Sequence, residues 1–149
     1  MPTIFDSPTY QQILQRVESL RPDSQRQWGK MSPAQMMEHV ARALEMAAGL
    51  RPSKQALLGK LIGWMVRSSF VGPKPFGKNM PTGPDFVIRD EPDFARTKAR
   101  LTRLLEDFHA KGERGCDGNI HGFFGKLAGA EWGITQFKHM DHHLRQFGV

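Results

Sequence analysis

The clearest helix in the sequence is encoded by residues 32–49, which read SPAQMMEHVARALEMAAG. Ser32 and Gln35 form the pattern of a capping box, and Pro33 takes the first helical position. Apolar side chains then repeat at helical spacing: Met36, Val40, Ala43, Leu44 and Ala47. Gly49 is placed to end the helix. This stretch therefore predicts an amphipathic helix with one buried face.

Three other segments, at about 8–20, 91–110 and 130–147, carry the same helical repeat of apolar residues. Ser7 as N-cap and Pro8 at the first helical position are typical of a helix start, and Gly148 follows the last segment. Residues 127–130 contain no Ser, Thr or Asp to cap that last helix. No strand-like alternation of polar and apolar residues competes with these helices.

A fifth apolar segment, at about 54–70, is predicted to be an accessory helix, although Gly59 and Gly63 lower its helix propensity. Residues 71–90 are rich in proline and glycine and are predicted to be a loop. No repeat or domain boundary is evident. We therefore expect one all-α domain over residues 1–149. It should be a four-helix bundle with an accessory helix and a long crossover between bundle helices 2 and 3.

The composition, 39% hydrophobic and 24% charged, is that of a globular protein. The one cysteine, Cys116, allows neither a disulfide within the chain nor a thiolate-rich zinc site, and we expect it to be a passive loop residue. Because 15 acidic residues accompany the basic ones, we interpret the net charge of +6 as dispersed surface charge and expect no nucleic-acid partner.

The first residues, MPTIFD, have neither the basic patch nor the apolar core of a signal peptide. The most apolar window, residues 56–71, contains Lys60 and Arg67 and is shorter than the roughly 20 residues that span a bilayer. We therefore expect a cytoplasmic protein with no membrane partner.

The histidines are concentrated near the C-terminus, where residues 138–147 read KHMDHHLRQF. On a helix, His139 and His143 lie about 40° apart on adjacent turns, and such a pair is able to bind one metal ion. A catalytic metal site generally needs a third protein ligand. His39, at the edge of the apolar stripe of the 32–49 helix, is the candidate, since bundles build metal sites from facing helices.

The same histidines are also compatible with surface or hydrogen-bonded side chains that bind no metal. We expect His142 to face solvent or the border of the site. His109 is expected to interact with a helix dipole at the end of its helix, and His121 to be a structural or exposed loop residue.

The acidic residues near the candidate ligands do not suggest a general base. Glu38, Glu45 and Asp141 project away from the histidine faces, so we expect them to be solvated. Gln35 and Gln136 lie near the ligand faces and are candidates for supporting the ligands, although a simple surface role is the alternative.

Several motifs together resemble the DinB-like superfamily, and more narrowly a small bacterial branch of it with no established reaction. They are the MMEH helix (36–39), the FFGKL turn (123–127), the EWG start (131–133) and the terminal HMDHHLRQFG block (139–148). The resemblance covers nearly the whole chain, and the C-terminal block is its most specific part.

The resemblance implies an up-down-down-up bundle with the long crossover after its second helix. It also implies a metal ion, nickel or zinc in related proteins, held by one histidine of the second helix and an i, i+4 pair of the last. These ligands correspond to His39, His139 and His143. Characterised relatives include transferases and isomerases that use low-molecular-weight thiols.

Two functions follow as hypotheses. The first is a metal-dependent enzyme that acts on a small molecule, by thiol-dependent group transfer or by hydrolysis. The second is a non-catalytic binding protein, a metal-stabilised homodimer included. The second hypothesis is motivated by the absence of paired carboxylates, of a nucleophile elbow and of a phosphate-binding loop. Residues 72–79, GPKPFGKN, are rich in glycine and lysine but lack the Gly-Lys-Ser/Thr ending of a phosphate-binding loop.

Overall fold

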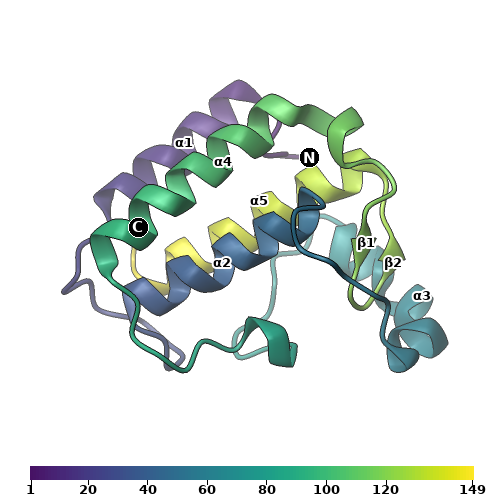
Figure 1. The fold of residues 1–149 in the computed structure, drawn as a ribbon, viewed down its shortest axis with the longest axis horizontal. Coiled ribbons are helices and arrows are strands. Elements are labelled where there is room, and N and C mark those ends of the chain that lie inside the picture. The colour runs from purple at the N-terminus through teal and green to yellow at the C-terminus, as the bar shows by residue number, and fades with distance from the viewer.

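The computed structural model describes residues 1–149 and is mostly helical, as predicted (Figure 1). The α-helices are α1 (Ser7–Ser19), α2 (Pro33–Ala47), α3 (Leu57–Val71), α4 (Phe94–Cys116) and α5 (Gly129–Gln146). One turn of 3₁₀ helix, η1, covers Pro84–Phe86 in the long segment between α3 and α4. Two short antiparallel strands, β1 (Ile120–His121) and β2 (Gly125–Lys126), connect α4 to α5.

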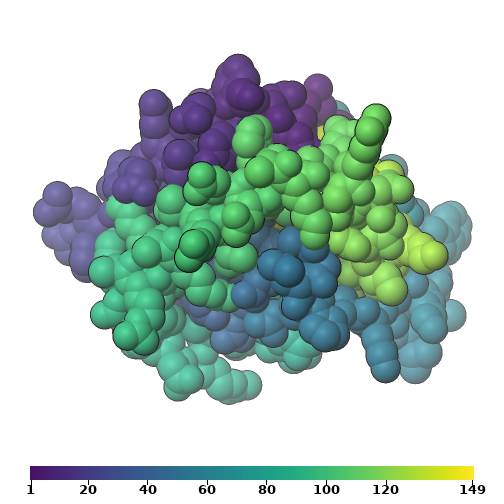
Figure 2. Space-filling view, turned by 45° about the horizontal axis from the view of Figure 1, so that its top comes forward, coloured from purple at the N-terminus to yellow at the C-terminus, as the bar shows by residue number.

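Four helices share one hydrophobic core. Helices α1 and α2 each pack against α4 and α5, and α4 also packs against α5. Most of the largest fully buried side chains come from these helices and the N-terminal segment, and they include Ile4, Ile13, Met36, Leu44, Phe108 and Trp132. Helix α3 lies outside this group, against α5 and β2. In Figure 2 the region of α3 and the α1–α2 connection lie at opposite ends of the long axis.

The predicted start of α2 is confirmed. The Gln35 amide N–H donates to the Ser32 hydroxyl at 3.1 Å, and the Ser32 amide donates to the Gln35 side chain at 3.0 Å. Gly49, with φ of +75°, follows the end of the helix as expected. The predicted cap of α1 is wrong, because Ser7 is already helical and the preceding Asp6 makes no side-chain capping bond.

Helix α5 begins without a local Ser, Thr or Asp, and two other carboxylates satisfy its first amides. The Gly129 amide donates to Asp117 at 2.9 Å, and the Ala128 amide donates to Glu131 at 2.8 Å. Asp117 follows α4, so tertiary structure supplies a cap that the local sequence lacks.

The helix predicted at about 91–110 extends further than expected. Helix α4 continues to Cys116, with a break at Gly112, where φ is +67°. Cys116 is therefore a buried helical residue rather than a loop residue, and burial raises the pKa of its thiol to about 11. The two strands that follow have two residues each, too few for an alternating pattern to be recognised.

Helix α3 forms as predicted despite its two glycines. A β-carbon on Gly59 would collide with the Phe123 carbonyl, so this glycine permits a close approach between α3 and the β1–β2 turn. None of the helices combines the length and the apolar character needed to cross a membrane.

Candidate metal centre

Three histidines from two helices converge at one point. The ligand atoms of His39 on α2 and of His139 and His143 on α5 all lie within 4.8 Å of one another. The Nε2 atoms of His39 and His139 are 2.9 Å apart. His39 and His143 are buried, and His139 is partly exposed. The proximity predicted for the i, i+4 pair and for His39 is therefore confirmed.

The outer nitrogens of two of these rings are held by hydrogen bonds. His39 Nδ1 donates to the Phe86 carbonyl at 2.9 Å, and His143 Nδ1 donates to Gln146 Oε1 at 2.8 Å. The Gln146 amide nitrogen donates in turn to the Trp28 carbonyl at 2.8 Å, so its oxygen faces His143. Both imidazoles thus carry their proton on Nδ1 and present an Nε2 lone pair to the centre.

The three rings are held in the neutral form. Burial lowers the pKa of His143 to about 3, and the repulsion that would arise if His39 were protonated as well adds to this effect; burial likewise lowers the pKa of His39. The pKa of His139 lies well below its ordinary value because of burial and of the neighbouring His143 and His39. Neutral imidazole is the form that binds metal ions.

The donor set fits a divalent metal ion. Nitrogens that bind one zinc ion at about 2.0–2.1 Å in tetrahedral geometry are roughly 3.3 Å apart. The 2.9 Å between His39 and His139 is close to that separation, and the three ligand atoms, which lie within 4.8 Å of one another, would draw together around a bound ion. Anchored outer nitrogens are typical of histidine ligands. Gln136, which precedes His139 by three residues on α5, has a buried Oε1 with no hydrogen-bond partner.

A family model for a group of proteins of unknown function, DUF1569, matches residues 5–148. The chain belongs to the DUF1569 family. No curated protein and no solved structure matches it.

Aromatic side chains surround the histidines of the DUF1569 protein. Phe86 lies with its ring 6.3 Å from that of His39, and Phe76 lies 6.5 Å from His139. Both come from the long segment between α3 and α4. Trp28, from the α1–α2 connection, contacts His142 edge-on at 5.6 Å. The two longest connections of the fold therefore border the histidine cluster.

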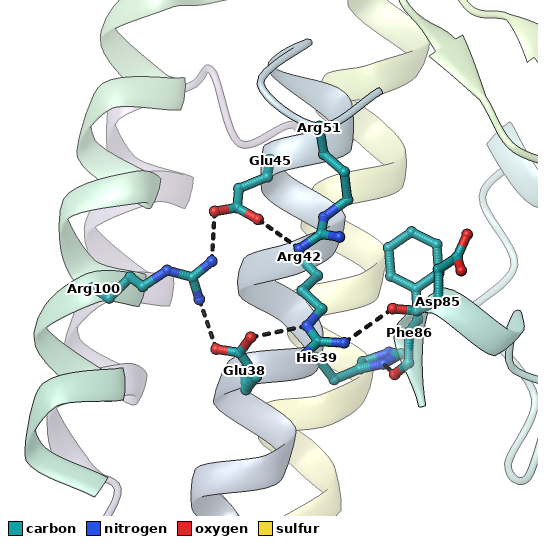
Figure 3. A network of polar contacts seen from close by, with 8 residues as sticks. All are labelled: Glu38, His39, Arg42, Glu45, Arg51, Asp85, Phe86 and Arg100. Atoms are coloured by element: carbon teal, nitrogen blue, oxygen red, sulfur yellow. Dashed lines mark hydrogen bonds and ion pairs between the residues drawn. The ribbon is translucent and has the colours of Figure 1, made fainter. Parts of the chain in front are cut away.

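An ion-pair network beside His39 fixes the η1 turn, whose Phe86 carbonyl accepts the hydrogen bond from the His39 ring (Figure 3). The Arg42 guanidinium donates to the Asp85 carbonyl at 3.1 Å and to Glu38 at 2.9 Å. Asp85 precedes Phe86, whose carbonyl accepts from His39. Arg42 thus connects α2 to η1 and supports the orientation of the His39 ring.

The expectation that the nearby carboxylates are solvated is wrong. Arg100 bridges Glu38 and Glu45, and Glu45 also pairs with Arg51 at 3.3 Å (Figure 3). Because α2 and α4 pack together, the side chains of Glu38 and Glu45 are only about one fifth exposed.

Asp141 is also paired, with Arg16 at 2.9 Å and with Arg145 at 2.8 Å. The carboxylates of Glu38, Glu45 and Asp141 are therefore engaged by arginines, and none of them is directed at the histidine cluster.

The remaining histidines have other roles. His109 lies in the last turn of α4 before the break at Gly112, close to the helix end predicted for it. Its Nδ1 donates to the Ile4 carbonyl at 2.9 Å, and its ring stacks on Tyr10 at 4.2 Å. His121 lies on β1 and has a structural role, since its Nδ1 accepts the amides of Phe123 and Phe124.

His142 borders the cluster, 5.0 Å from the ring of His143, as predicted. Gln35 is engaged in the α2 cap and donates to the Asp90 carbonyl, so it does not support a ligand. The groups that support the ligands are the Gln146 side chain, which accepts from His143, and the Phe86 carbonyl, which accepts from His39. The sequence analysis identified neither of them. The i, i+3 spacing of His143 and Gln146 was the only signal available for either.

Proposed function

We propose that His39, His139 and His143 bind one divalent metal ion in a DinB-like four-helix bundle, and that this centre makes the protein a metal-dependent enzyme acting on a small molecule. The observation that carries the proposal is the convergence of three neutral imidazoles, two of them with anchored outer nitrogens. Nickel and zinc are the metals that the DinB-like resemblance implies, and both accept imidazole ligands.

The arrangement of the helices supports the bundle. In Figure 1 the chain runs in one direction along α1 and α5 and in the opposite direction along α2 and α4. The long connection between α2 and α4, which includes α3 and η1, fits the crossover of an up-down-down-up bundle. We accordingly retain the DinB-like assignment and a cytoplasmic location as part of the proposal.

The residues around the site would hold the metal ion and orient its imidazole ligands. The Phe86 carbonyl and Gln146 keep two imidazoles in the tautomer that binds metal, and the aromatic rings of Phe76 and Phe86 restrict access of water. Three protein ligands leave a coordination position for a substrate. A bound divalent ion supplies Lewis-acid chemistry, which lowers the pKa of a thiol or of water.

Thiol-dependent group transfer is the reaction that the resemblance favours, with a low-molecular-weight thiol as co-substrate, and hydrolysis is a second possibility. A non-catalytic, metal-stabilised binding protein, monomeric or dimeric, is the alternative. It is supported by the arginine pairing of Glu38 and Asp141, which leaves no carboxylate near the histidines to serve as a general base.

The two functions are distinguished by turnover. Protein loaded with nickel or zinc is incubated with a panel of electrophiles and low-molecular-weight thiols, and thiol-adduct formation is measured. The proposal expects turnover that a chelator abolishes, that His139→Ala lacks and that the matched variant His142→Ala retains. Bound metal without chelator-sensitive turnover across the panel, and without metal-dependent ester or amide hydrolysis, would favour the binding-protein alternative.

A further inference from the structure

Helix α3 presents an apolar face that no part of the chain covers. Leu57, Leu61 and Trp64 are 79%, 71% and 74% exposed, although most large apolar side chains of the protein are buried or partly buried. The same helix also exposes Leu58, Ile62, Met65 and Val66. An exposed apolar cluster of this size on one helix is typical of a binding surface.

Contacts on the opposite side fix this orientation. Gly59 and Gly63 are the buried residues of α3, and they approach the Phe123 carbonyl of the β1–β2 turn. Arg67 pairs with Glu131 of α5 through its Nε at 3.0 Å. Lys138, also on α5, donates to the carbonyls of Phe70 and Gly72 at the end of α3. The helix is therefore held by its small and polar side, and its apolar side is directed outward.

The net charge of the protein falls in the stretch of sequence that contains this helix. Residues 51–84 contain six Lys and Arg and no Asp or Glu, whereas the rest of the chain has 15 of each sign. The whole net charge of +6 thus lies in one segment. Arg51 and Arg67 form ion pairs with Glu45 and Glu131, but the four lysines of the segment are exposed and form none: Lys54, Lys60, Lys74 and Lys78. Dispersed surface charge does not describe this distribution.

We propose that α3 binds an anionic membrane surface, lying in the plane of the interface with the side of Leu57, Leu61 and Trp64 among the lipids. An interfacial helix combines an apolar face with neighbouring cations that attract anionic headgroups. Tryptophan is favoured at the level of the headgroups. Helix α3 has 15 residues and no helix of the chain is able to span a bilayer, so binding is peripheral.

The charge also decides between a membrane and a second copy of the chain. Two copies that paired through α3 would bring two acid-free, positively charged segments together, and the repulsion would oppose association. An anionic lipid surface instead attracts the exposed Lys60 on the helix and Lys54 just before it. The proposal concerns α3 and does not depend on the metal centre.

Binding is tested by co-sedimentation of the full chain with vesicles of phosphatidylcholine alone or of equal parts phosphatidylcholine and phosphatidylglycerol. We expect binding to the anionic vesicles that weakens as salt is raised. We also expect the fluorescence of Trp64 to shift to the blue, with no such shift in Trp64→Phe. Binding that is equal on the two kinds of vesicle would overturn the role of the lysines, and with it the proposal.

Two pairs of test and control variants distinguish specific binding through α3 from nonspecific adsorption to vesicles. Leu61→Gln should weaken partitioning about tenfold or more, and Leu50→Gln should not, although Leu50 is 65% exposed. The double variant Lys54→Gln, Lys60→Gln should weaken it about 25-fold, roughly fivefold per charge. The control double variant Arg103→Gln, Arg114→Gln removes the same charge from exposed positions on α4, and it should leave vesicle binding unchanged.

Each variant is first compared with the wild type by circular dichroism, which should be unchanged because the substituted side chains are exposed. Equal loss in test and control variants would overturn the proposal. It would also be overturned if the protein ignored anionic vesicles and sedimented as a dimer that Leu61→Gln converts to a monomer, because the apolar face would then serve a second copy.

Discussion

The Nε2 atoms of His39 and His139 lie 2.9 Å apart, although α2 and α5 are separated by most of the chain. Because His39 carries its proton on Nδ1, the proton between the two rings belongs to His139. The two imidazoles share this one proton, and burial together with the repulsion between neighbouring protonated histidines keeps the pair from gaining another. A divalent cation would be able to take the place of that proton at Nε2, and His139 would then carry its proton on Nδ1.

Gln146 should position His143 for binding. The Gln146→Leu variant removes the acceptor of the His143 Nδ1 proton and frees the tautomer, so we expect nickel or zinc affinity to fall about 10- to 100-fold. Affinity is measured by competition with a chromophoric chelator, and circular dichroism checks the fold. Unchanged affinity in a folded variant would show that Gln146 does not position the ligand.

Arg42 should act on His39 through the η1 turn. Arg42→Met removes the bond to the Asp85 carbonyl and loosens the segment that ends in the Phe86 acceptor. We expect metal affinity to fall about fivefold, the value of one hydrogen bond of about 1 kcal/mol. Arg51→Met is the control, since Arg51 belongs to the same network but contacts only Glu45. Equal effects of the two substitutions on affinity would argue against a path through η1.

His121 should make stability depend on pH. Burial lowers its pKa to about 4 in the folded protein, from an ordinary value of about 6.5. Between these values the unfolded chain binds the proton that the folded chain rejects. The contribution of His121 is therefore fully present above pH about 6.5 and is lost as pH falls toward 4, by about 3 kcal/mol in total.

The His121→Asn variant tests this linkage. Its amide oxygen is able to accept the Phe123 and Phe124 amides, but it does not titrate. Urea unfolding in the presence of a chelator, at several pH values, should give a smaller loss of unfolding free energy on acidification than in the wild type. Parallel pH profiles for the two proteins would contradict a buried neutral His121.

The helices could be predicted from sequence where capping and periodicity agreed. Ser32 and Gln35 fixed the start of α2 within the local sequence, and the apolar repeat defined its buried face. The start of α5 depends on Asp117, which reaches it only after the chain has passed through the β1–β2 turn. Likewise, the exposure of α3 followed from tertiary packing of Gly59 and Gly63, not from its apolar composition.

The candidate site was predictable in its donors but not in its supports. Helical spacing alone placed His139 and His143 on one face of α5. The Phe86 carbonyl is a backbone group in an irregular segment, and no pattern of side chains in the sequence predicts its position. The arginine partners of Glu38 and Asp141 come from other helices, so those carboxylates looked solvated in the sequence.

The metal content of the purified protein tests the central claim most directly. Untagged wild type, His142→Ala and the double variant His139→Ala, His143→Ala are reconstituted with nickel or zinc, freed of loose metal and analysed by elemental mass spectrometry. The account predicts one equivalent of metal in the wild type and in His142→Ala, and none in the double variant. Equal metal in all three proteins, or no metal in any of them, would contradict a metal centre formed by His39, His139 and His143.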